Sequence, residues 1–157
     1  MRSVPLVIVL LLATAAPSLA QQARFPWRPG DRAPAVAGLR LKDSRARIDS
    51  LLGSPDTQQA MGSGVVSLGY RSRGLTLVYS EADSLAVIDL NTSAAGDIDS
   101  VRVGDMRERV LARWGQPTTV DGGNALWVVG AWVVVVRLGP QNQVAILSLG
   151  RSADNDQ

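Results

Sequence analysis

The sequence of 157 residues contains no cysteine and no histidine. The absence of cysteine excludes disulfide bonds and thiolate nucleophiles, and the two absences together remove the soft ligands of zinc sites. Without histidine, the chain also lacks the commonest general base. Lys42 is the only lysine, so a Ser/Lys nucleophile pair would depend on it, but its position just before a helix start is typical of a solvated side chain. We therefore predict a non-enzymatic protein with no cofactor and no metal site.

The N-terminal stretch has the pattern of a cleavable signal peptide. Arg2 precedes an apolar run over residues 4–16, and the small-residue site Ser18-Leu19-Ala20 follows. The run is shorter than the roughly 20 residues that span a bilayer, which disfavours the alternative of an uncleaved anchor. A bacterial lipid anchor needs a cysteine at the cleavage point, where this chain has Gln21. We predict a periplasmic or secreted protein.

Charge is nearly balanced once the signal peptide is removed. Loss of Arg2 leaves 15 basic side chains (16 − 1) against 14 acidic ones. Such a chain has no strong overall field to attract nucleic acid or an anionic membrane surface. No later segment of the sequence is apolar over the length of a membrane span. The predicted partner is therefore a protein, with no nucleic acid and no integral membrane span after signal cleavage.

An internal repeat predicts two short helices. Residues 101–118 align without a gap with residues 39–56 at an offset of 62 positions (101 − 39), and six of the eighteen positions are identical. Asp43 and Asp105 are the candidate N-caps, since a carboxylate accepts hydrogen bonds from the free amides of the first turn. In both copies a glycine and a proline end the helix. Because helices this short are marginal alone in water, both are expected to pack on a sheet.

Three strand-like runs follow each predicted helix, with connections of hairpin length that favour antiparallel meanders. The runs cover residues 65–70, 74–79 and 85–90, then residues 125–129, 132–138 and 144–149. Residues 132–136 are apolar at every position, so both faces of that strand need a cover. One face is expected to meet the second helix and the other the first copy. Alternatively, the second face binds another protein or a second subunit.

The predicted fold class is α+β, with two tandem α-β-β-β repeats, each a three-stranded antiparallel meander packed against one helix. The predicted order is signal peptide 1–20, linker 21–35, first module 36–91, linker 92–100, second module 101–150 and disordered tail 151–157. Trp27, in the first linker, is expected to cover the edge of the first module. A docking point for a partner is the alternative.

The helix, its Gly-x-Pro exit and the three strands resemble small periplasmic modules of the SmpA/OmlA (BamE-like) lipoproteins and of the β-lactamase-inhibitor proteins. The matching motifs are Gly104-Asp105-Met106, Trp114-Gly115-Gln116-Pro117 with the strand around Trp127, and Leu52-Gly53-Ser54-Pro55 with Tyr70. The chain lacks the anchor cysteine of the lipoproteins and the disulfide cysteines of the inhibitors. Two modules in tandem look more like the inhibitors. The resemblance implies an envelope-associated or secreted protein that binds or inhibits another protein.

Aromatic side chains are scarce, with four Trp, two Tyr and one Phe. Because aromatic residues dominate interface energetics, we predict a binding surface where they gather, around the Gly130-Ala131 turn. The predicted binding residues are Trp127, Trp132 and Val134, with Tyr70, Arg71 and Arg73 in the first module. Burial in the core is the alternative for the tryptophans. We predict an interaction module for a protein partner or a second copy; the alternative is a small-molecule-binding protein or an unrecognised hydrolase.

Overall fold

The fold is described by a computed structural model for residues 25–80 and 82–152. The predicted signal peptide, residues 1–20, lies outside the described residues. In chain order the described elements are α1 (Arg45–Leu52), β1 (Thr57–Ala60), β2 (Val66–Tyr70), η2 (Arg71–Arg73), β3 (Leu75–Tyr79), β4 (Leu85–Leu90), η3 (Ser93–Ala95), α2 (Arg107–Trp114), β5 (Thr119–Asp121), β6 (Asn124–Val129), β7 (Trp132–Leu138) and β8 (Val144–Arg151).

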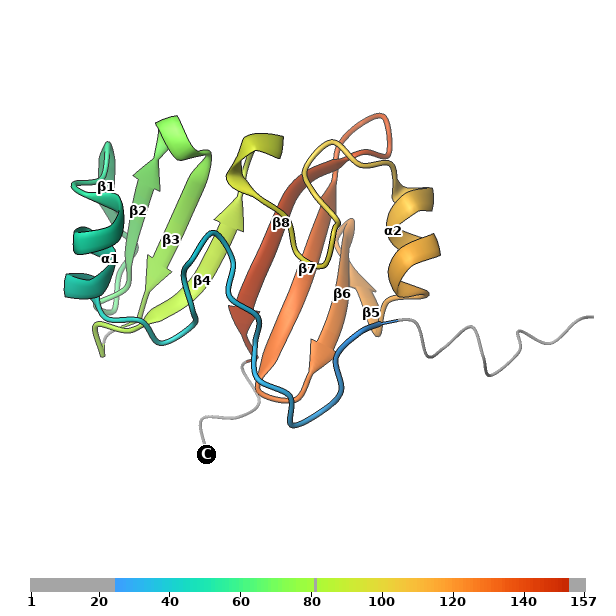
Figure 1. The fold of residues 1–157 in the computed structure, drawn as a ribbon, viewed down its shortest axis with the longest axis horizontal. Coiled ribbons are helices and arrows are strands. Elements are labelled where there is room, and N and C mark those ends of the chain that lie inside the picture. Colours follow the sequence, from blue (N-terminus) through green and yellow to red (C-terminus); the bar gives the residue numbers. More distant parts are fainter. Residues whose placement is uncertain (1–24, 81, 153–157) are drawn as a thin grey trace, which may run out of the picture.

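In the described part of the chain, all eight strands belong to one antiparallel sheet, in the order β1-β2-β3-β4-β8-β7-β6-β5 (Figure 1). The prediction of two tandem α-β-β-β repeats, each with its own meander, is therefore wrong. Strands β4 and β8 pair with each other from Val87↔Gly150 to Leu90↔Leu147. Two separate meanders would leave both strands with unpaired backbone groups along an apolar edge. Pairing β4 with β8 satisfies those groups and joins the two halves.

The sequence pattern missed the two outermost strands, β1 and β5. Every residue of both strands is exposed, so neither strand carries an apolar alternation that would reveal it. Within the sheet, strand β1 pairs with β2 alone and β5 with β6 alone. Short, polar edge strands of this kind protect a sheet against pairing with other chains. Each half of the sheet therefore has four strands where three were predicted.

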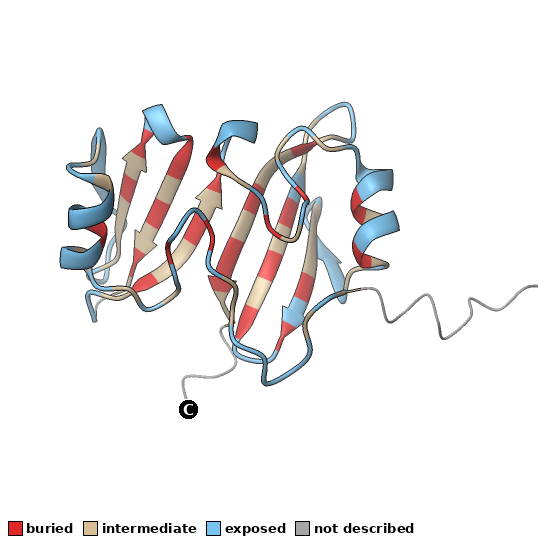
Figure 2. Ribbon diagram, viewed as in Figure 1, coloured by how far each residue is buried: buried red, intermediate tan, exposed pale blue. Residues whose placement is uncertain are grey.

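One face of the sheet carries the core. A cross-strand row of buried side chains crosses the β4–β8 junction and runs through Leu77, Ile88, Leu149, Val134 and Trp127. Helix α1 buries Ile48 and α2 buries Val110 and Trp114 in the same core. Figure 2 shows the resulting alternation of buried and less buried positions along the strands. The helices and the sheet thus enclose one continuous apolar layer.

Strand β7 has apolar side chains on both faces, but the first half of the chain does not cover its second face. Its buried residues are Trp132, Val134 and Val136, on the core face. Val133 and Val135 point the other way and are half-buried. The first half lies beside the second in the same sheet rather than on top of it (Figure 1). The expectation that β7 meets the first copy face to face is therefore wrong.

The helix N-caps lie one residue later than predicted. Ser44 caps α1 and accepts a hydrogen bond from the third residue after it, whereas Met106, at the same place before α2, has no side-chain cap. Asp43 and Asp105 instead accept from the backbone N–H three residues earlier, at 2.9 and 3.0 Å. Each also forms an ion pair with the arginine four residues later, at 3.3 Å. These carboxylates therefore order the turn that leads into the helix.

The N-terminal segment packs across the second half of the sheet. Phe25 lies 5.5 Å from Trp114 and 6.1 Å from Trp127, measured between ring centroids. Trp27 contacts Trp132 edge to face at 5.4 Å. Trp27 was expected to cover the edge of the first module, and it covers the second half instead. Edge-to-face aromatic pairs add to the apolar burial that holds this segment in place.

Candidate functional site

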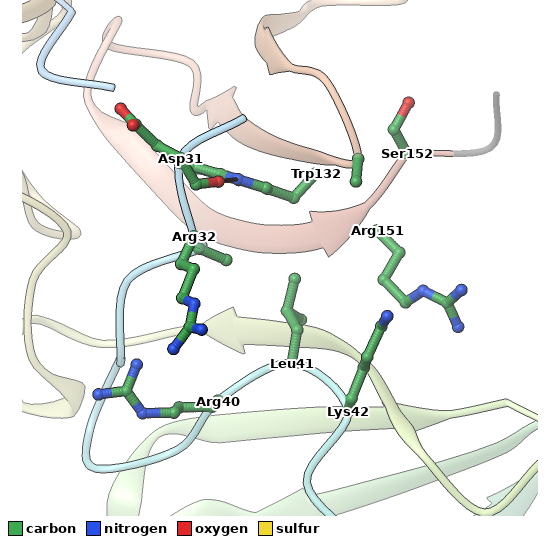
Figure 3. A pocket seen from close by; sticks show the side chains of 10 residues that line it. Asp31, Arg32, Arg40, Leu41, Lys42, Trp132, Arg151 and Ser152 are labelled. Atoms are coloured by element: carbon green, nitrogen blue, oxygen red, sulfur yellow. Dashed lines mark hydrogen bonds between the residues drawn. The ribbon is translucent and has the colours of Figure 1, made fainter. Parts of the chain in front are cut away.

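A cleft of about 610 Å³ opens where the N-terminal segment crosses the ends of β7 and β8 (Figure 3). We call it the basic cleft. Its lining consists of Asp31, Arg32, Ala33, Arg40, Leu41, Lys42, Ala131, Trp132, Arg151 and Ser152. The volume falls within the range of about 300–1,000 Å³ that is usual for ligand sites. The lining comes from three parts of the chain that only the folded structure brings together.

The first wall of the basic cleft is fixed to the sheet by a tryptophan. The indole N–H of Trp132 donates to the backbone carbonyl of Asp31, at 2.8 Å. The Asp31 carboxylate accepts from the backbone N–H of Arg28 at 2.7 Å, closing a local turn. In Figure 3 this carboxylate points away from the basic side chains of the cleft. The acidic residue in the lining therefore holds the wall in position and does not neutralise the basic groups.

A tight reversal brings the next part of the lining back along the first. Val36 and Leu39 exchange two backbone hydrogen bonds of 2.9 Å. The two residues between them, Ala37 and Gly38, have φ values of 52° and 80°, as a two-residue reversal with positive φ at both central positions requires. The side chains of Val36 and Leu39 are buried in the core. The reversal is thus anchored, and it sets Arg32 and Arg40 on the same cleft.

Hydrogen bonds to the start of β4 position Lys42. Its backbone N–H donates to the carbonyl of Leu85 at 2.8 Å, and the N–H of Leu85 donates to the carbonyl of Asp43 at 3.0 Å. Lys42 has φ of 73°, a left-handed conformation that costs a non-glycine residue roughly 1–2 kcal/mol. Contacts on either side of Lys42 compensate for this cost. The conformation directs the chain so that Arg40, Leu41 and Lys42 all line the cleft.

The sheet supplies the third part of the lining. Trp132 is paired with Arg151 in the β7–β8 register. Beyond the end of β8, the N–H of Ser152 donates to the carbonyl of Ala131 at 2.9 Å. This bond prolongs the β7–β8 pairing past its last regular pair. Arg151 and Ser152 are therefore held at the rigid end of a central strand.

The basic cleft carries unbalanced positive charge. Toward the other described residues, the side chains of Arg32, Arg40 and Lys42 form neither a salt bridge nor a hydrogen bond. Arg151 adds a further positive charge to the lining. Guanidinium groups bind carboxylates through two parallel hydrogen bonds, and an ammonium group acts as a point charge. The arrangement favours an anionic ligand over a neutral or cationic one.

The side chains of the cleft do not form a nucleophile pair. Ser152 and Lys42 both line the cleft, but in Figure 3 the Ser152 hydroxyl points away from the Lys42 ammonium group. Within the described residues no hydrogen bond joins them, whereas an activated serine needs a base within hydrogen-bond reach. The described residues also contain no group of three or more acidic side chains that could hold a metal ion. The Ser152 and Lys42 side chains are therefore not arranged as a serine nucleophile and its base.

Two titratable groups outside the basic cleft, Asp89 and Tyr79, have raised pKa values. Burial raises the pKa of Asp89, while a 2.6 Å hydrogen bond from Ser148 acts in the opposite direction. Burial likewise raises the pKa of Tyr79, whose ring lies 5.9 Å from the Arg45 guanidinium carbon. Tyr79 stays neutral at pH 7, and its hydroxyl has no hydrogen-bond partner among the described residues. Tyr79 interacts electrostatically with Tyr70, Arg45 and Asp49, and Asp89 with Arg137, and none of these groups lines the basic cleft.

Among the residues predicted to bind a partner, Trp127 and Val134 are cross-strand neighbours and Trp132 lines the basic cleft, but their side chains are buried. Trp127, Trp132 and Tyr70 are each 3% exposed, and Val134 is fully buried. These side chains belong to the core, so the predicted surface around the two tryptophans is not available to a partner. Their apolar rings fill the space between the sheet and its cover instead.

Arg71 and Arg73 are exposed in η2, between β2 and β3. Strand β3 begins beside the end of β4, since Leu75 pairs with Leu90. The basic cleft lies beside the opposite end of β4, where Lys42 bonds to Leu85. The two predicted arginines are therefore at the other end of the strands from the cleft.

The comparisons with known proteins report likeness of fold. A cysteine-rich secretory protein from Staphylococcus aureus superposes with a TM-score of 0.59 at 11% identity, over 80% of this chain and 49% of its own. A DUF4309 family protein (YjgB) from Bacillus subtilis superposes with a TM-score of 0.52 at 11% identity, over 71% of this chain and 80% of its own. An extracellular protein containing an SCP domain, from Bacillus anthracis, superposes with a TM-score of 0.48 at 7% identity, over 70% of this chain and 43% of its own.

No protein-family model and no curated protein matches the sequence. The resemblance to SmpA/OmlA and β-lactamase-inhibitor modules therefore stays a prediction. The chain spans about half, 49%, of the length of the Staphylococcus protein. At such low identities the likeness concerns the fold alone. Of these three neighbours, one is described as a secretory protein and one as an extracellular protein. No helix in residues 25–80 or 82–152 has the length and apolar character needed to cross a membrane.

Proposed function

We propose that the protein is an exported, non-catalytic interaction module that binds an acidic segment of a partner protein in the basic cleft. The observation that carries this proposal is the unbalanced charge of Arg32, Arg40 and Lys42 around one cleft of about 610 Å³. Carboxylate groups are the protein side chains that pair with such cations. Export is supported by the signal pattern at the N-terminus and by the likeness in fold to a cysteine-rich secretory protein.

A binding role fits the chemistry of the cleft better than a catalytic one. The backbone that carries the cleft is held by hydrogen bonds of residues 31, 42 and 152, so its walls need little rearrangement when a ligand arrives. The hydroxyl of Ser152 points away from the ammonium group of Lys42. The alternative of an unrecognised hydrolase gains no support from this geometry.

Charge neutralisation in the cleft tests the proposal. The variant Arg40→Gln with Lys42→Gln is compared with Arg71→Gln and Arg73→Gln, which removes the same charge from the exposed hairpin between β2 and β3. The probe is fluorescein-labelled decaglutamate, followed by fluorescence anisotropy. Two lost contacts of about 0.5–1 kcal/mol each weaken binding by about 5- to 30-fold in the cleft variant. The hairpin variant should stay within about twofold of the wild type.

Two results would contradict the proposal. Equal losses in the cleft and hairpin variants would mean that decaglutamate responds to net charge and not to the cleft. No binding to the wild-type protein, at an ionic strength where surface charges are little screened, would mean that the cleft does not take an acidic segment.

A further inference from the structure

The basic groups of the cleft are divided by an apolar side chain. In Figure 3, Arg32 and Arg40 lie on one side of Leu41, and Lys42 and Arg151 lie on the other. The side chain of Leu41 rises between these two groups and is half-buried against the core. The positive charge is therefore presented as two separate positions with an apolar strip between them, and not as one continuous patch.

We propose that the segment recognised by the cleft contains two acidic side chains that flank an apolar one. One carboxylate would pair with Arg32 and Arg40, the other with Lys42, and the apolar side chain would lie on Leu41. This inference rests on the proposed function, because it specifies the acidic segment that the cleft binds. It assigns a separate task to each of the two basic groups and to Leu41.

The apolar strip is rigid enough to select a ligand. The backbone on either side of Leu41 is held, since Arg40 donates its N–H to the Asp43 carboxylate at 2.9 Å and Lys42 donates to Leu85 at 2.8 Å. Ala33 and Ala131 add small apolar side chains to the lining. A hydrophilic group placed on this strip would lose water without gaining a hydrogen bond, which is unfavourable. An apolar side chain would gain from the same contact.

Charge distribution favours a short acidic segment over a long polyanion. Beyond residue 20 the chain has 15 basic and 14 acidic residues, so its net charge exerts little overall attraction on a long polyanion. The aromatic ring in the lining is Trp132, which is only 3% exposed and therefore gives no platform for stacking nucleic-acid bases. The attraction is centred on the cleft, where Arg32, Arg40 and Lys42 form no ion pair with the other described residues.

Four short peptides test the pattern on the wild-type protein. They share Gly-Ser flanks and have the cores Glu-Leu-Glu, Glu-Ser-Glu, Glu-Leu-Gln and Gln-Leu-Glu, with sodium polyphosphate as a non-peptide anion. Isothermal titration calorimetry is expected to give Glu-Leu-Glu about tenfold tighter binding than Glu-Ser-Glu, because only leucine covers the strip. Each peptide with one acidic residue should be weaker by about 3- to 10-fold.

Protein variants assign the contacts. Arg40→Gln and Lys42→Gln should each weaken Glu-Leu-Glu, and each single-acid peptide should respond to only one of the two substitutions. Leu41→Ser should remove the preference for leucine over serine, whereas Leu51→Ser, at a residue of α1 that is 46% exposed and outside the cleft lining, should leave it unchanged. If Leu41→Ser fails to fold, the comparison of Glu-Leu-Glu with Glu-Ser-Glu on the wild type still decides the question.

The outcomes separate this inference from the proposed function. Equal binding of Glu-Leu-Glu and Glu-Ser-Glu, still dependent on Arg40 and Lys42, would overturn the two-site pattern and leave the acidic-segment proposal standing. The two-site pattern would also be overturned, with the acidic-segment proposal left standing, if each single-acid peptide lost the same affinity on Arg40→Gln as on Lys42→Gln. Binding of polyphosphate with no binding of any peptide would overturn both, and it would reassign the cleft to a phosphate polymer.

Discussion

At the scale of single residues, Asp89 is a carboxyl group whose ionised form is disfavoured by burial. It lies at the β4–β8 junction, where it is paired with Ser148. The Ser148 hydroxyl donates to its carboxylate at 2.6 Å, yet burial has the larger effect and raises the pKa of Asp89. A carboxylate in such a place is stabilised by only one side-chain hydrogen bond while it loses hydration.

The raised pKa predicts a pH-dependent stability difference between the wild type and Asp89→Asn. The folded chain binds the proton of Asp89 more tightly than the unfolded chain does, so the neutral carboxyl stabilises the fold fully below the ordinary pKa of 3.8. That contribution is lost as the pH rises through the higher folded pKa. The unfolding free energy of the wild type minus that of the variant should therefore fall with rising pH. Urea unfolding at about pH 3 to 7 measures this difference. A difference that increases with pH would contradict a raised pKa of Asp89 in the folded chain.

Individual residues of the basic cleft were beyond the reach of sequence reasoning. Arg40 appeared only as an identity in the internal repeat, and Lys42 was interpreted as a solvated side chain. Arg32 and Arg151 belong to segments predicted as a linker and a tail. The cleft exists because the Val36–Leu39 reversal and the β7–β8 pairing bring these positions together. No local pattern encodes a contact between positions so far apart in sequence.

At the scale of elements, apolar periodicity predicted the strands that have a buried face and missed the strands whose residues are all exposed. The predicted strands at 85–90 and 132–138 coincide with β4 and β7, whose buried residues alternate. Strands β1 and β5 carry no apolar pattern and were not predicted. The N-terminal segment was predicted as a linker because its prolines interrupt any period, yet isolated aromatic residues bind it to the sheet. Single anchoring contacts of this kind leave no periodic signal.

The anchoring of the N-terminal segment predicts that Trp27→Ala destabilises the fold. Trp27 is half-buried and packs edge to face on Trp132, so its loss should cost about 1–3 kcal/mol of unfolding free energy. Because Trp132 also holds the carbonyl of Asp31, the variant should bind decaglutamate more weakly as well. Urea unfolding and fluorescence anisotropy measure the two effects. Arg28→Ala, at an exposed neighbour, is the control, and an unfolding midpoint equal to that of the control would show that the segment is not anchored.

At the scale of the whole molecule, the β4–β8 pairing decides whether the halves are independent. The internal repeat predicted two modules because each copy contains a helix and its strands. Sequence periodicity reports which side chains face a core, but it does not report which strand edges meet. Here the buried row from Leu77 to Trp127 passes through Ile88 and Leu149 without a break. Unfolding one half would expose the edge and the core of the other.

We therefore expect the two halves to unfold in one cooperative transition. The tryptophans of the described chain outside the N-terminal segment are Trp114, Trp127 and Trp132, all in the second half, so their fluorescence reports that half. Amide NMR signals of β2 and β3 report the first half. The two probes should give the same urea midpoint in the wild type, as a two-state transition requires.

A substitution at the junction makes this test decisive. Leu149→Ala removes a fully buried side chain from β8 and should cost about 2–5 kcal/mol. Because Leu149 faces Ile88 across the junction, both probes should move together to a lower urea concentration. Val135→Ala, on the uncovered face of β7, is the matched control and should cost less, since that side chain is only half-buried. Retention of the original midpoint by the β2 and β3 amides, while the tryptophan midpoint falls, would mean that the continuous sheet contains two independently stable halves.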